Sequence, residues 1–468
     1  MGYSLPTSAQ NAFLSGAYQT ATLAVTLADG TTATLTNKDI RQNGLVIDRR
    51  MVPGEHMVLG ATMASEMTVV LDNATGAFTG VDFHGAEMDV VINVTKNGLT
   101  TSCEMGIFII DSVSWGVNCV ELSGLDRMVL FDKVVDFSSI SFPISVANLV
   151  SAICTACGVP LSASISSEPN ATYSIASAPS DTNVSYRQLL VWCLQIMGAS
   201  AYCNWNGVLV VTGFPALNVY SDDAFPSASA ERRFSSYVSD EVTRFSGVSV
   251  FDEAGNEYYS GQSTPESNDK IRIFGNPLIQ SNYATIAANI WQGRSVIEFK
   301  AFEVETTPMP WKWPFDFLSV QVSKPGVMPT VSKIVRVTHV LFKLNGRNRI
   351  SCNVKGQTAE DLFPTSPVTT GQSATIDERI KNQFYIVTGT LASSASYSSA
   401  ISYPTGLNRD NCQIMSFEVY HGSMWKSGDG LANAGYRTFA ALRSADIRAY
   451  NDDPALYELG FRITLRKL

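Results

Sequence analysis

The sequence predicts a mainly β protein with a small α+β lobe, on three observations. Apolar residues recur at every second position in many short segments, Asn-Gly pairs separate several of these segments, and helical periodicity is confined to a few places. A length of 468 residues predicts about three domains, at roughly 150 residues per domain. We expect a first β-barrel domain in residues 1–140, the α+β lobe in 141–228, a second, related β-barrel domain in 229–360, a linker in 361–382 and a C-terminal β-sandwich in 383–468.

The first β-rich region is organised around residues 40–111. Apolar residues alternate in segments 40–49 and 59–73, which places one face of each strand on a core. Two further strands within 89–103 flank Asn97-Gly98, whose residue types suit the positive φ angles of a type I′ hairpin. Another strand is expected at 23–27, before the hairpin pair Asp29-Gly30, and a pair of strands within 107–115.

The predicted lobe contains two helices and a hairpin. From Ser145 onward the apolar residues fall on one helical face, until a glycine and a proline end the helix. The second helix opens with Ser185 and has Gln188 three residues later, which is a capping box. Two short strands then flank Asn206-Gly207, so a helix followed by a hairpin completes an α+β unit.

The region after residue 229 repeats the β-rich pattern, interrupted by a predicted helix at 283–291. Its last hairpin is closed by Asn345-Gly346, as one hairpin of the first region is closed by Asn97-Gly98. Two β-rich regions of similar length with such hairpins indicate a duplicated barrel. The strands are expected at 242–250, 295–302, 317–320, 334–344 and 350–354, and those of the C-terminal sandwich at 385–387, 415–419 and 457–465.

The order of these motifs resembles the N-terminal region of bacteriophage tail hub proteins, the baseplate-hub or tail-associated family. The resemblance begins in the first β-rich region and continues through the lobe, and it stops before the C-terminal domain. One departure is the segment 314–317, where this family tends to have Gly-Asp before a strand. The matching residues are Gly44, Ile47 to Arg49, Leu59-Gly60, Ser65-Glu66, Thr68, Leu71 to Asn73, Gly85-Ala86, Tyr186 to Leu190, Gly198-Ala199 and Trp205 to Leu209.

This resemblance implies a structural virion protein without enzymatic activity, a homotrimer whose β-barrels, like those of a tail tube, form a ring that continues the tail lumen. Three copies with two similar barrels each present six quasi-equivalent faces to a sixfold tube. The implied partners are the distal tail protein or tail-tube ring, the tape-measure protein and other tail-tip or receptor-binding proteins. DNA is expected to pass through the channel without specific binding. The implied location is the phage tail tip, after synthesis in the host bacterial cytoplasm.

The composition agrees with a protein covered by partners. Charged residues make up only 16% of the chain, against roughly 25% in typical soluble proteins. The net charge of −9 and the pI near 5.1 argue against sequence-independent DNA binding, which depends on Lys and Arg that neutralise phosphates. The first twenty residues lack the features of a signal peptide, and no apolar run approaches the roughly 20 residues of a membrane span.

We predict no catalytic, cofactor-binding or metal-binding residues and no cofactor. Cys154 and Cys157 have the spacing of half a zinc site, but they lie on the apolar helical face and lack further ligands. Glu87 and Asp89 project from one strand face, and a solvated face explains them better than a glycosidase pair across a cleft. His339 falls within a strand and is interpreted as structural. The other histidines are His56, His84 and His421, and none of the four belongs to an HExxH motif.

The C-terminal region offers aromatic residues that suit either a sandwich core or stacking on sugar rings. The glycine-rich segment 421–430 is expected to be a loop, and Asp452-Asp453-Pro454 a turn. Two alternative functions therefore stay open at this point, a cell-wall hydrolase on a β-rich scaffold and a carbohydrate-binding adhesin acting through the C-terminal domain. The aromatic candidates are Tyr403, Tyr420, Trp425 and Tyr436.

Overall fold

In the computed structural model the chain is mainly β and forms two units, Met1–Gln372 and Ser373–Leu468. The boundary falls within the segment predicted as a linker, which lies outside the described residues, and the finer division into domains stays a prediction. The structure describes residues 5–51, 57–180, 183–213, 227–228, 233–262, 270–292, 297–314, 316–321 and 332–354, and the backbone of 384–391, 397–401, 412–421, 424–427, 438–442, 447–451 and 459–467.

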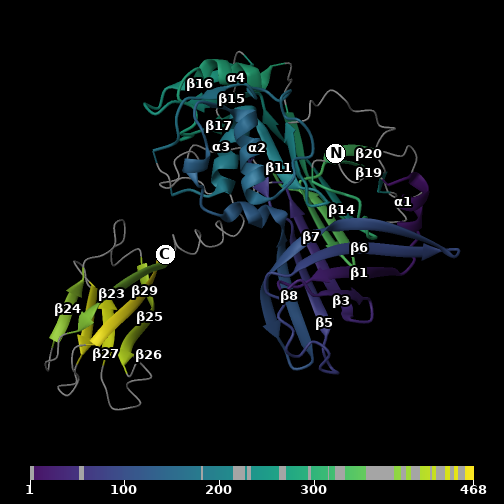
Figure 1. Ribbon diagram of the computed structural model, residues 1–468, viewed down its shortest axis with the longest axis horizontal. Coiled ribbons are helices and arrows are strands. Elements are labelled where there is room, and N and C mark those ends of the chain that lie inside the picture. Colours follow the sequence, from purple (N-terminus) through teal and green to yellow (C-terminus); the bar gives the residue numbers. More distant parts are fainter. Residues whose placement is uncertain are drawn as a thin grey trace. The chain divides into compact units, whose positions relative to one another are not determined.

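An eleven-stranded antiparallel sheet lies at the centre of the first unit (Figure 1). Its order is β14-β18-β22-β21-β3-β5-β8-β7-β6-β1-β2. Every second side chain of β5 and β6 is buried, so the predicted alternation does place one face of these strands on a core. The strands are β1 Gln19–Thr26, β2 Thr32–Thr36, β3 Ile40–Arg50, β5 Glu66–Asp72, β6 Glu87–Lys96, β7 Leu99–Trp115, β8 Cys119–Asp126, β14 Arg233–Phe245, β18 Ile297–Thr306, β21 His339–Lys343 and β22 Asn348–Cys352.

The two halves of this sheet have the same strand order. In the first half the spatial order is β3-β5-β8-β7-β6, which are the first, second, fifth, fourth and third of these five strands along the chain. In the second half β14, β18, β22 and β21 lie side by side, and β19 pairs with β20 in a small separate sheet with β13. If β20 and β21 are counted as one strand, the second half has the same spatial order: first (β14), second (β18), fifth (β22), fourth (β20 with β21) and third (β19). The additional strands are β13 Ser227–Ala228, β19 Phe317–Gln321 and β20 Ser332–Arg336.

The segment 334–344, predicted as one strand, is divided between β20 and β21. The chain changes sheets at this point, because β20 pairs with β19 whereas β21 pairs with β22 and β3. Backbone hydrogen bonds hold the two intervening residues, with Val337 N donating to Asp316 O at 2.8 Å and Thr338 N donating to Ser351 O at 3.0 Å. The predicted strand 242–250 is divided in the same way, since β14 ends at Phe245 and β15 begins in a different sheet.

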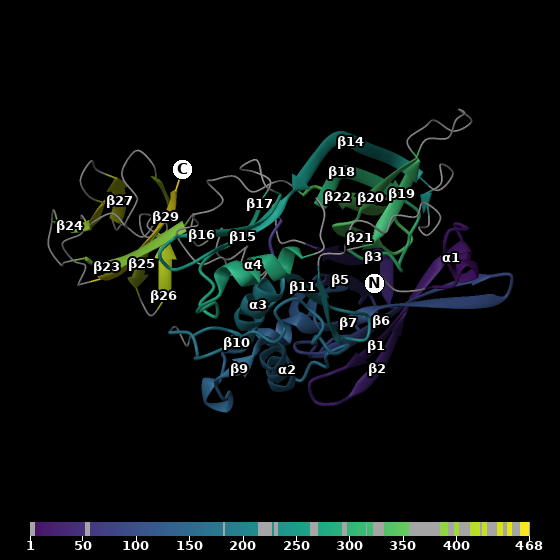
Figure 2. The same ribbon diagram turned by 90° about the horizontal axis from the view of Figure 1, so that it is seen from above.

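The β6–β7 hairpin projects beyond the rest of the sheet (Figures 1 and 2). Asn97 and Gly98 have φ angles of 53° and 78°, which confirms the predicted turn with two positive φ angles. β7 continues for 17 residues, so the strand pair predicted within 107–115 is wrong, and these residues are the second half of one long strand. A bulge lies opposite Val90 and Val91, where Gly106 has a φ of 138° that disfavours any residue with a Cβ atom.

Two helices and a hairpin form the lobe, as predicted. Ser145 Oγ accepts a hydrogen bond from Asn148 N at 3.3 Å, and Ser185 Oγ accepts one from Gln188 N at 3.1 Å, so each serine caps its helix. The hairpin β11–β12 pairs in parallel with the short strand β4, which connects the lobe to the first half of the main sheet. These elements are β4 Thr62–Met63, η1 Arg127–Asp132, η2 Phe137–Ser139, β9 Ile144–Ser145, α2 Val146–Cys157, β10 Ser174–Ile175, α3 Tyr186–Met197, β11 Ala199–Cys203 and β12 Leu209–Gly213.

A second small sheet, β16-β15-β17, carries helix α4 (Figure 1). The helix has the predicted bounds, and Tyr283 at its start stacks on Tyr258 of β16 with the ring centroids 5.3 Å apart. This insertion separates the first and second strands of the second half. The elements of the insertion are β15 Gly247–Phe251, β16 Glu257–Gly261, β17 Lys270–Ile273 and α4 Tyr283–Trp291. The remaining helix of the first unit, α1 Thr7–Phe13, precedes β1.

The second unit contains two antiparallel sheets, β23-β29-β25-β26 and β24-β28-β27. Their packing into a β-sandwich stays a prediction. The segment 421–430, predicted as a loop, contains the strand β26, because His421 and Met424 are paired and leave only a two-residue connection. The strands are β23 Phe384–Leu391, β24 Tyr397–Ile401, β25 Cys412–His421, β26 Met424–Ser427, β27 Thr438–Leu442, β28 Ile447–Asn451 and β29 Leu459–Lys467.

Candidate functional site

The described cysteines do not form a metal site. Cys154 and Cys157 lie on the buried face of α2, as predicted, with exposed fractions of 4% and 3%. Burial raises the pKa of Cys154 to about 12 and that of Cys157 to about 11, which disfavours the thiolate form that a metal requires. Across the described part of the chain, no group of three or more His, Cys, Asp or Glu residues is placed to hold a metal ion.

The carboxylates of β6 take part in the surface structure of the sheet. Glu87 Oε1 accepts a hydrogen bond from Arg127 Nη2 at 2.7 Å, and this ion pair ties β6 to η1. Burial and the neighbouring Glu87 both raise the pKa of Asp89. Neither residue lines either of the two cavities described in this section, so the geometry gives no support to a glycosidase pair.

His339 lies on β21, as predicted, and belongs to a Ser-His-Asp arrangement. Its Nε2 is 2.9 Å from Asp48 Oδ1, and its Nδ1 is 3.4 Å from Ser351 Oγ. The three residues stand on adjacent strands, and Ser351 is only 2% exposed, so its hydroxyl is closed to a substrate. The arrangement therefore fixes the pairing of β3 with β21. Of the other histidines, His84 is exposed, His421 ends β25, and His56 lies outside the described residues.

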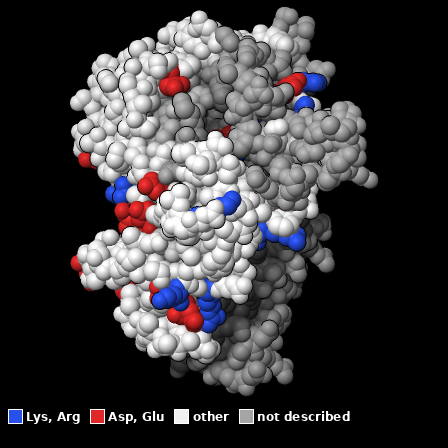
Figure 3. All heavy atoms as spheres, turned by 90° about the vertical axis from the view of Figure 1, so that its right-hand side faces the viewer, with Lys and Arg blue, Asp and Glu red and all other residues white. Residues whose placement is uncertain are grey.

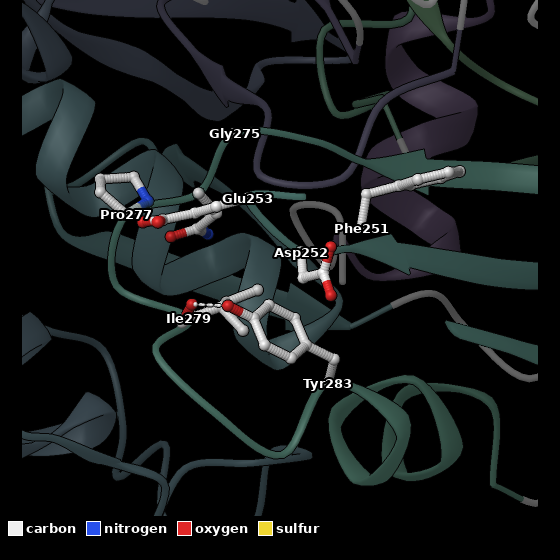
Figure 4. Close-up of a pocket in the computed structure, with 8 residues that line it drawn as sticks. Phe251, Asp252, Glu253, Gly275, Pro277, Ile279 and Tyr283 are labelled. Atoms are coloured by element: carbon white, nitrogen blue, oxygen red, sulfur yellow. Dashed lines mark hydrogen bonds between the residues drawn. The ribbon is translucent and has the colours of Figure 1, made fainter. Parts of the chain in front are cut away.

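A cavity of about 120 Å³ lies between the β15–β16 connection and the start of α4 (Figure 4). Asp252 points toward it, but its carboxylate accepts hydrogen bonds from Asn256 N, Asn256 Nδ2 and Tyr258 Oη within its own hairpin. The Tyr283 hydroxyl donates a hydrogen bond of 2.8 Å to Ile279 O, and both residues line the cavity. These polar groups hold the loops together, and a ligand would have to displace them.

In the C-terminal unit, Tyr420 and Trp425 are backbone partners in the β25–β26 hairpin. Tyr403, Tyr436 and the predicted turn Asp452-Asp453-Pro454 lie outside the described residues.

The arrangement that stands out is the junction of β3 with β21, where the two halves of the main sheet become continuous. Five residue pairs join these strands, from His339 with Arg50 to Lys343 with Val46. Leu344 N continues the ladder by donating to Leu45 O at 3.0 Å. The junction is therefore built as an ordinary antiparallel strand pair, although its partners lie almost 300 residues apart in the chain.

Side chains reinforce this junction on both faces of the sheet. On one face Asp48 binds both His339 and Arg50, the latter through Arg50 Nη2 at 2.9 Å. At its end Asn345 exchanges two hydrogen bonds of 2.8 Å with the backbone of Gln19. These contacts make the two halves one structural body.

On the other face the junction buries an arginine. Arg49 is 1% exposed, its guanidinium carbon lies 3.9 Å from the centre of the Trp313 ring, and its Nη2 donates to Met105 O. Burial lowers the pKa of Arg49 to about 10. A second cavity beside it, of about 10 Å³, is lined by Arg49, Arg50, Met63, Ser65, Tyr202, Trp313 and Pro314 and has room for little more than one water molecule.

Two of the sheet edges that have no strand partner among the described residues carry exposed aromatic residues. Phe234 and Tyr237 on the outer strand β14 are 55% and 63% exposed. Trp115 at the end of β7 is 51% exposed, and Val117 in the following turn is 98% exposed. The sequence reasoning did not identify these residues, because alternation places a side chain on a face of a strand without showing whether the strand edge has a neighbour.

Charge is sparse on the surface, as the composition predicts. On the face drawn in Figure 3, Lys, Arg, Asp and Glu occur in small groups separated by wide uncharged areas. None of the described helices has the length and apolar character needed to cross a membrane.

The comparisons with known proteins find no matching family model and no matching curated protein. Among solved structures, the 43 kDa tail protein of prophage MuSo2 from Shewanella oneidensis is 14% identical, with a TM-score of 0.44, and the match covers 70% of this chain and 97% of that one. A tail protein from Neisseria meningitidis MC58 is 11% identical, with a TM-score of 0.43, covering 74% of this chain and 98% of that one. A Francisella PdpA-VgrG complex gives 11% identity, a TM-score of 0.43, and coverage of 94% and 72%. Tail proteins are the class that the sequence motifs resemble.

Proposed function

We propose that this chain is a structural tail-tip, or baseplate, hub protein of a bacteriophage. In this proposal it is a homotrimer that joins the tail tube or distal tail ring to the tip and encloses the channel for DNA and the tape-measure protein. The observation that carries the proposal is the repeated strand order of the main sheet together with the β3–β21 junction. The ordered hub-like motifs of the first half and the lobe agree with it.

The physical argument concerns symmetry. Both halves have the same five-strand order, with the third strand of the second half, β19, in the adjoining small sheet, so one chain offers two similar units that are already joined side by side. Three such chains provide six units, and six similar units suit a sixfold tube. A single enzyme active site requires no such repetition, whereas a ring that continues a tube does.

The charge distribution supports a passive channel. A net charge of −9 with only 16% charged residues gives little attraction for the phosphate backbone. DNA that must move through a channel benefits from a wall that does not hold it. We therefore assign the protein a non-enzymatic role in the virion tail, with tail-tube, tape-measure and other tail-tip proteins as its partners.

The test is to image assembled phage tails by cryo-electron microscopy and to measure the mass of the purified full chain by native mass spectrometry. The expected mass is three times that of the 50.7 kDa chain, and the expected map has a closed ring at the tail tip. A chain that stays monomeric, in tails whose tip contains no ring of this protein, would contradict the proposal.

A further inference from the structure

We infer that neighbouring copies in the ring are joined by strand pairing between β14 of one chain and the end of β7, residues 111–115, of the next. This inference rests on the proposed function, since it names the surfaces through which the proposed trimer closes. It commits to a second copy of this chain as the occupant of both edges.

The β3–β21 junction within the chain supplies the template. β3 is the first of the five strands in its half, and β21 belongs to the fourth strand of the other half. The contact between the two halves is therefore a pairing of a first strand with a fourth strand. Two corresponding strands remain for a contact of the same kind. They are β14, the first strand of the second half, and β7, the fourth strand of the first half.

The partner that we assign to β14 lies along its outer edge. β14 ends the main sheet, and in the described part of the chain no strand pairs with its outer side. Residues 234–237 are all exposed, and segment 234–239 contains no charged residue and no proline, whereas the second half of β14 contains Asp240, Glu241 and Arg244. Natural proteins usually protect exposed edges with charged residues or proline, so the uncharged segment 234–239, with two exposed aromatic side chains, is the part of this edge that we assign to the partner.

The end of β7 is free on the matching side. β6 pairs with β7 only as far as Ile109, and Gly85 and Ala86 bond to the backbone of Ile110. Residues 112–115 continue to pair with β8 after a bulge at Asp111, but no described strand lies on their other side. The equivalent side of β21 is the one that β3 occupies. Trp115 thus stands at an open edge in the position where the other half already has a neighbour.

The remaining free edge, β2, is a weaker candidate. Its exposed residues Thr32, Ala33 and Thr34 offer no large apolar side chain. Because β14 and the end of β7 are different surfaces of one chain, their pairing is heterologous, and each copy has one of each. Repeating the contact with a suitable rotation closes a ring in which junctions within and between chains alternate.

The experiment compares three double variants of the full chain by native mass spectrometry and sedimentation. The β14 variant carries Phe234→Lys and Tyr237→Lys, and the β7 variant carries Trp115→Lys and Val117→Lys. The matched control replaces two equally exposed apolar residues away from both edges, Leu99→Lys and Val134→Lys, which are 72% and 65% exposed in the unchanged chain. The melting temperature of each variant establishes that it folds.

We expect the β14 and β7 variants each to raise the concentration needed for trimer formation by about tenfold or more, because each replaces two exposed apolar side chains in or next to the proposed contact by charged ones. The control variant should assemble like the unchanged chain. A mixture of the β14 and β7 variants should form dimers and nothing larger, since one intact junction remains between them.

Trimers that persist in both edge variants would overturn the edge assignment and leave the hub proposal standing. Loss of trimers in the control variant as well would also overturn it, because the effect would not be specific to these edges. An unchanged chain that is monomeric would instead contradict the proposed function itself.

Discussion

At the scale of single residues, Arg49 is the most informative side chain of the β3–β21 junction. Its Nε and Nη1 have no hydrogen-bond partner among the described residues, so its stabilising contacts are the stacking on Trp313 and one bond to Met105 O. The side chain therefore acts chiefly through its volume. The sequence could not predict this, because an arginine in a strand is normally read as exposed.

We predict that Arg49→Ala lowers the free energy of unfolding of the first unit by about 3 kcal/mol, because it leaves a cavity beside Trp313. Arg49→Met should change it by less than about 1.5 kcal/mol, since a buried charge is replaced by apolar volume. Chemical denaturation followed by tryptophan fluorescence measures both. Equal losses in the two variants would show that the charge, and not the volume, stabilises the junction.

The carboxylate of Asp48 gives the junction a dependence on pH. Burial raises its pKa, but hydrogen bonds from His339 and Arg50 outweigh this and lower the pKa to about 2, below the ordinary value of 3.8. A carboxyl group whose pKa is depressed in the folded state stabilises the fold above its unfolded pKa. This contribution, about 2 kcal/mol, is lost as the pH falls from about 4 to 2.

We predict that Asp48→Asn removes most of this pH dependence between 2 and 4 and lowers stability near neutral pH by about 2 kcal/mol. Urea denaturation at several pH values measures the change. Asp29 is a suitable control, because its pKa is also lowered but it is fully exposed and bonds only within its own turn. A variant with an unchanged acid profile would contradict the assignment to Asp48.

At the scale of elements, the ends of the two lobe helices can be compared directly. Gly158 and Gly198 both follow a helix with a left-handed φ, at 70° and 61°. A Cβ atom at Gly158 would meet nothing within 4 Å, whereas one at Gly198 would lie 2.5 Å from Cγ2 of Ile290 in α4. Gly198 therefore sets the distance between α3 and α4 as well as ending α3.

We predict that Gly158→Ala costs about 1 kcal/mol, the strain of a left-handed alanine. Gly198→Ala should cost about 1 to 3 kcal/mol more, because Ile290 must also move. Thermal unfolding of the two variants measures the difference, and Gly198→Ala should cost less in a chain that already carries Ile290→Ala, which lacks Cγ1 and Cγ2. Equal losses would mean that α4 can move away freely.

The bounds of helices and strands could be predicted where neighbouring residues in the sequence determine them. They could not be predicted where pairing with a distant strand determines them. The serine caps, the glycine stops of α2 and α3 and the bounds of α4 follow from neighbouring residues and are confirmed. The division between β20 and β21 depends on which sheet each part joins, and no local residue indicates it.

The paired Asn-Gly turns suggested a repeat, but Asn97-Gly98 joins the third and fourth strands and Asn345-Gly346 the fourth and fifth. The repeat is in the strand order, which the sequence could not give.

At the scale of the whole molecule, all strands assigned to the ring belong to the first unit. We predict that a chain ending at residue 372 still forms trimers, because the second unit contributes neither β14 nor β7. Native mass spectrometry of the shortened chain measures this. A shortened chain that is folded and monomeric would show that residues 373–468 hold the ring together.

The β3–β21 junction also has a consequence for synthesis on the ribosome. Asp48 and His339 are 291 residues apart, so at roughly 5 to 20 residues per second the edge of β3 waits about 15 to 60 s for its own partner. During that time β21 of another copy, made from the same messenger RNA, can pair with the edge of β3. The order of translation thus makes exchange of β21 between copies the misfolding route that we expect for this chain.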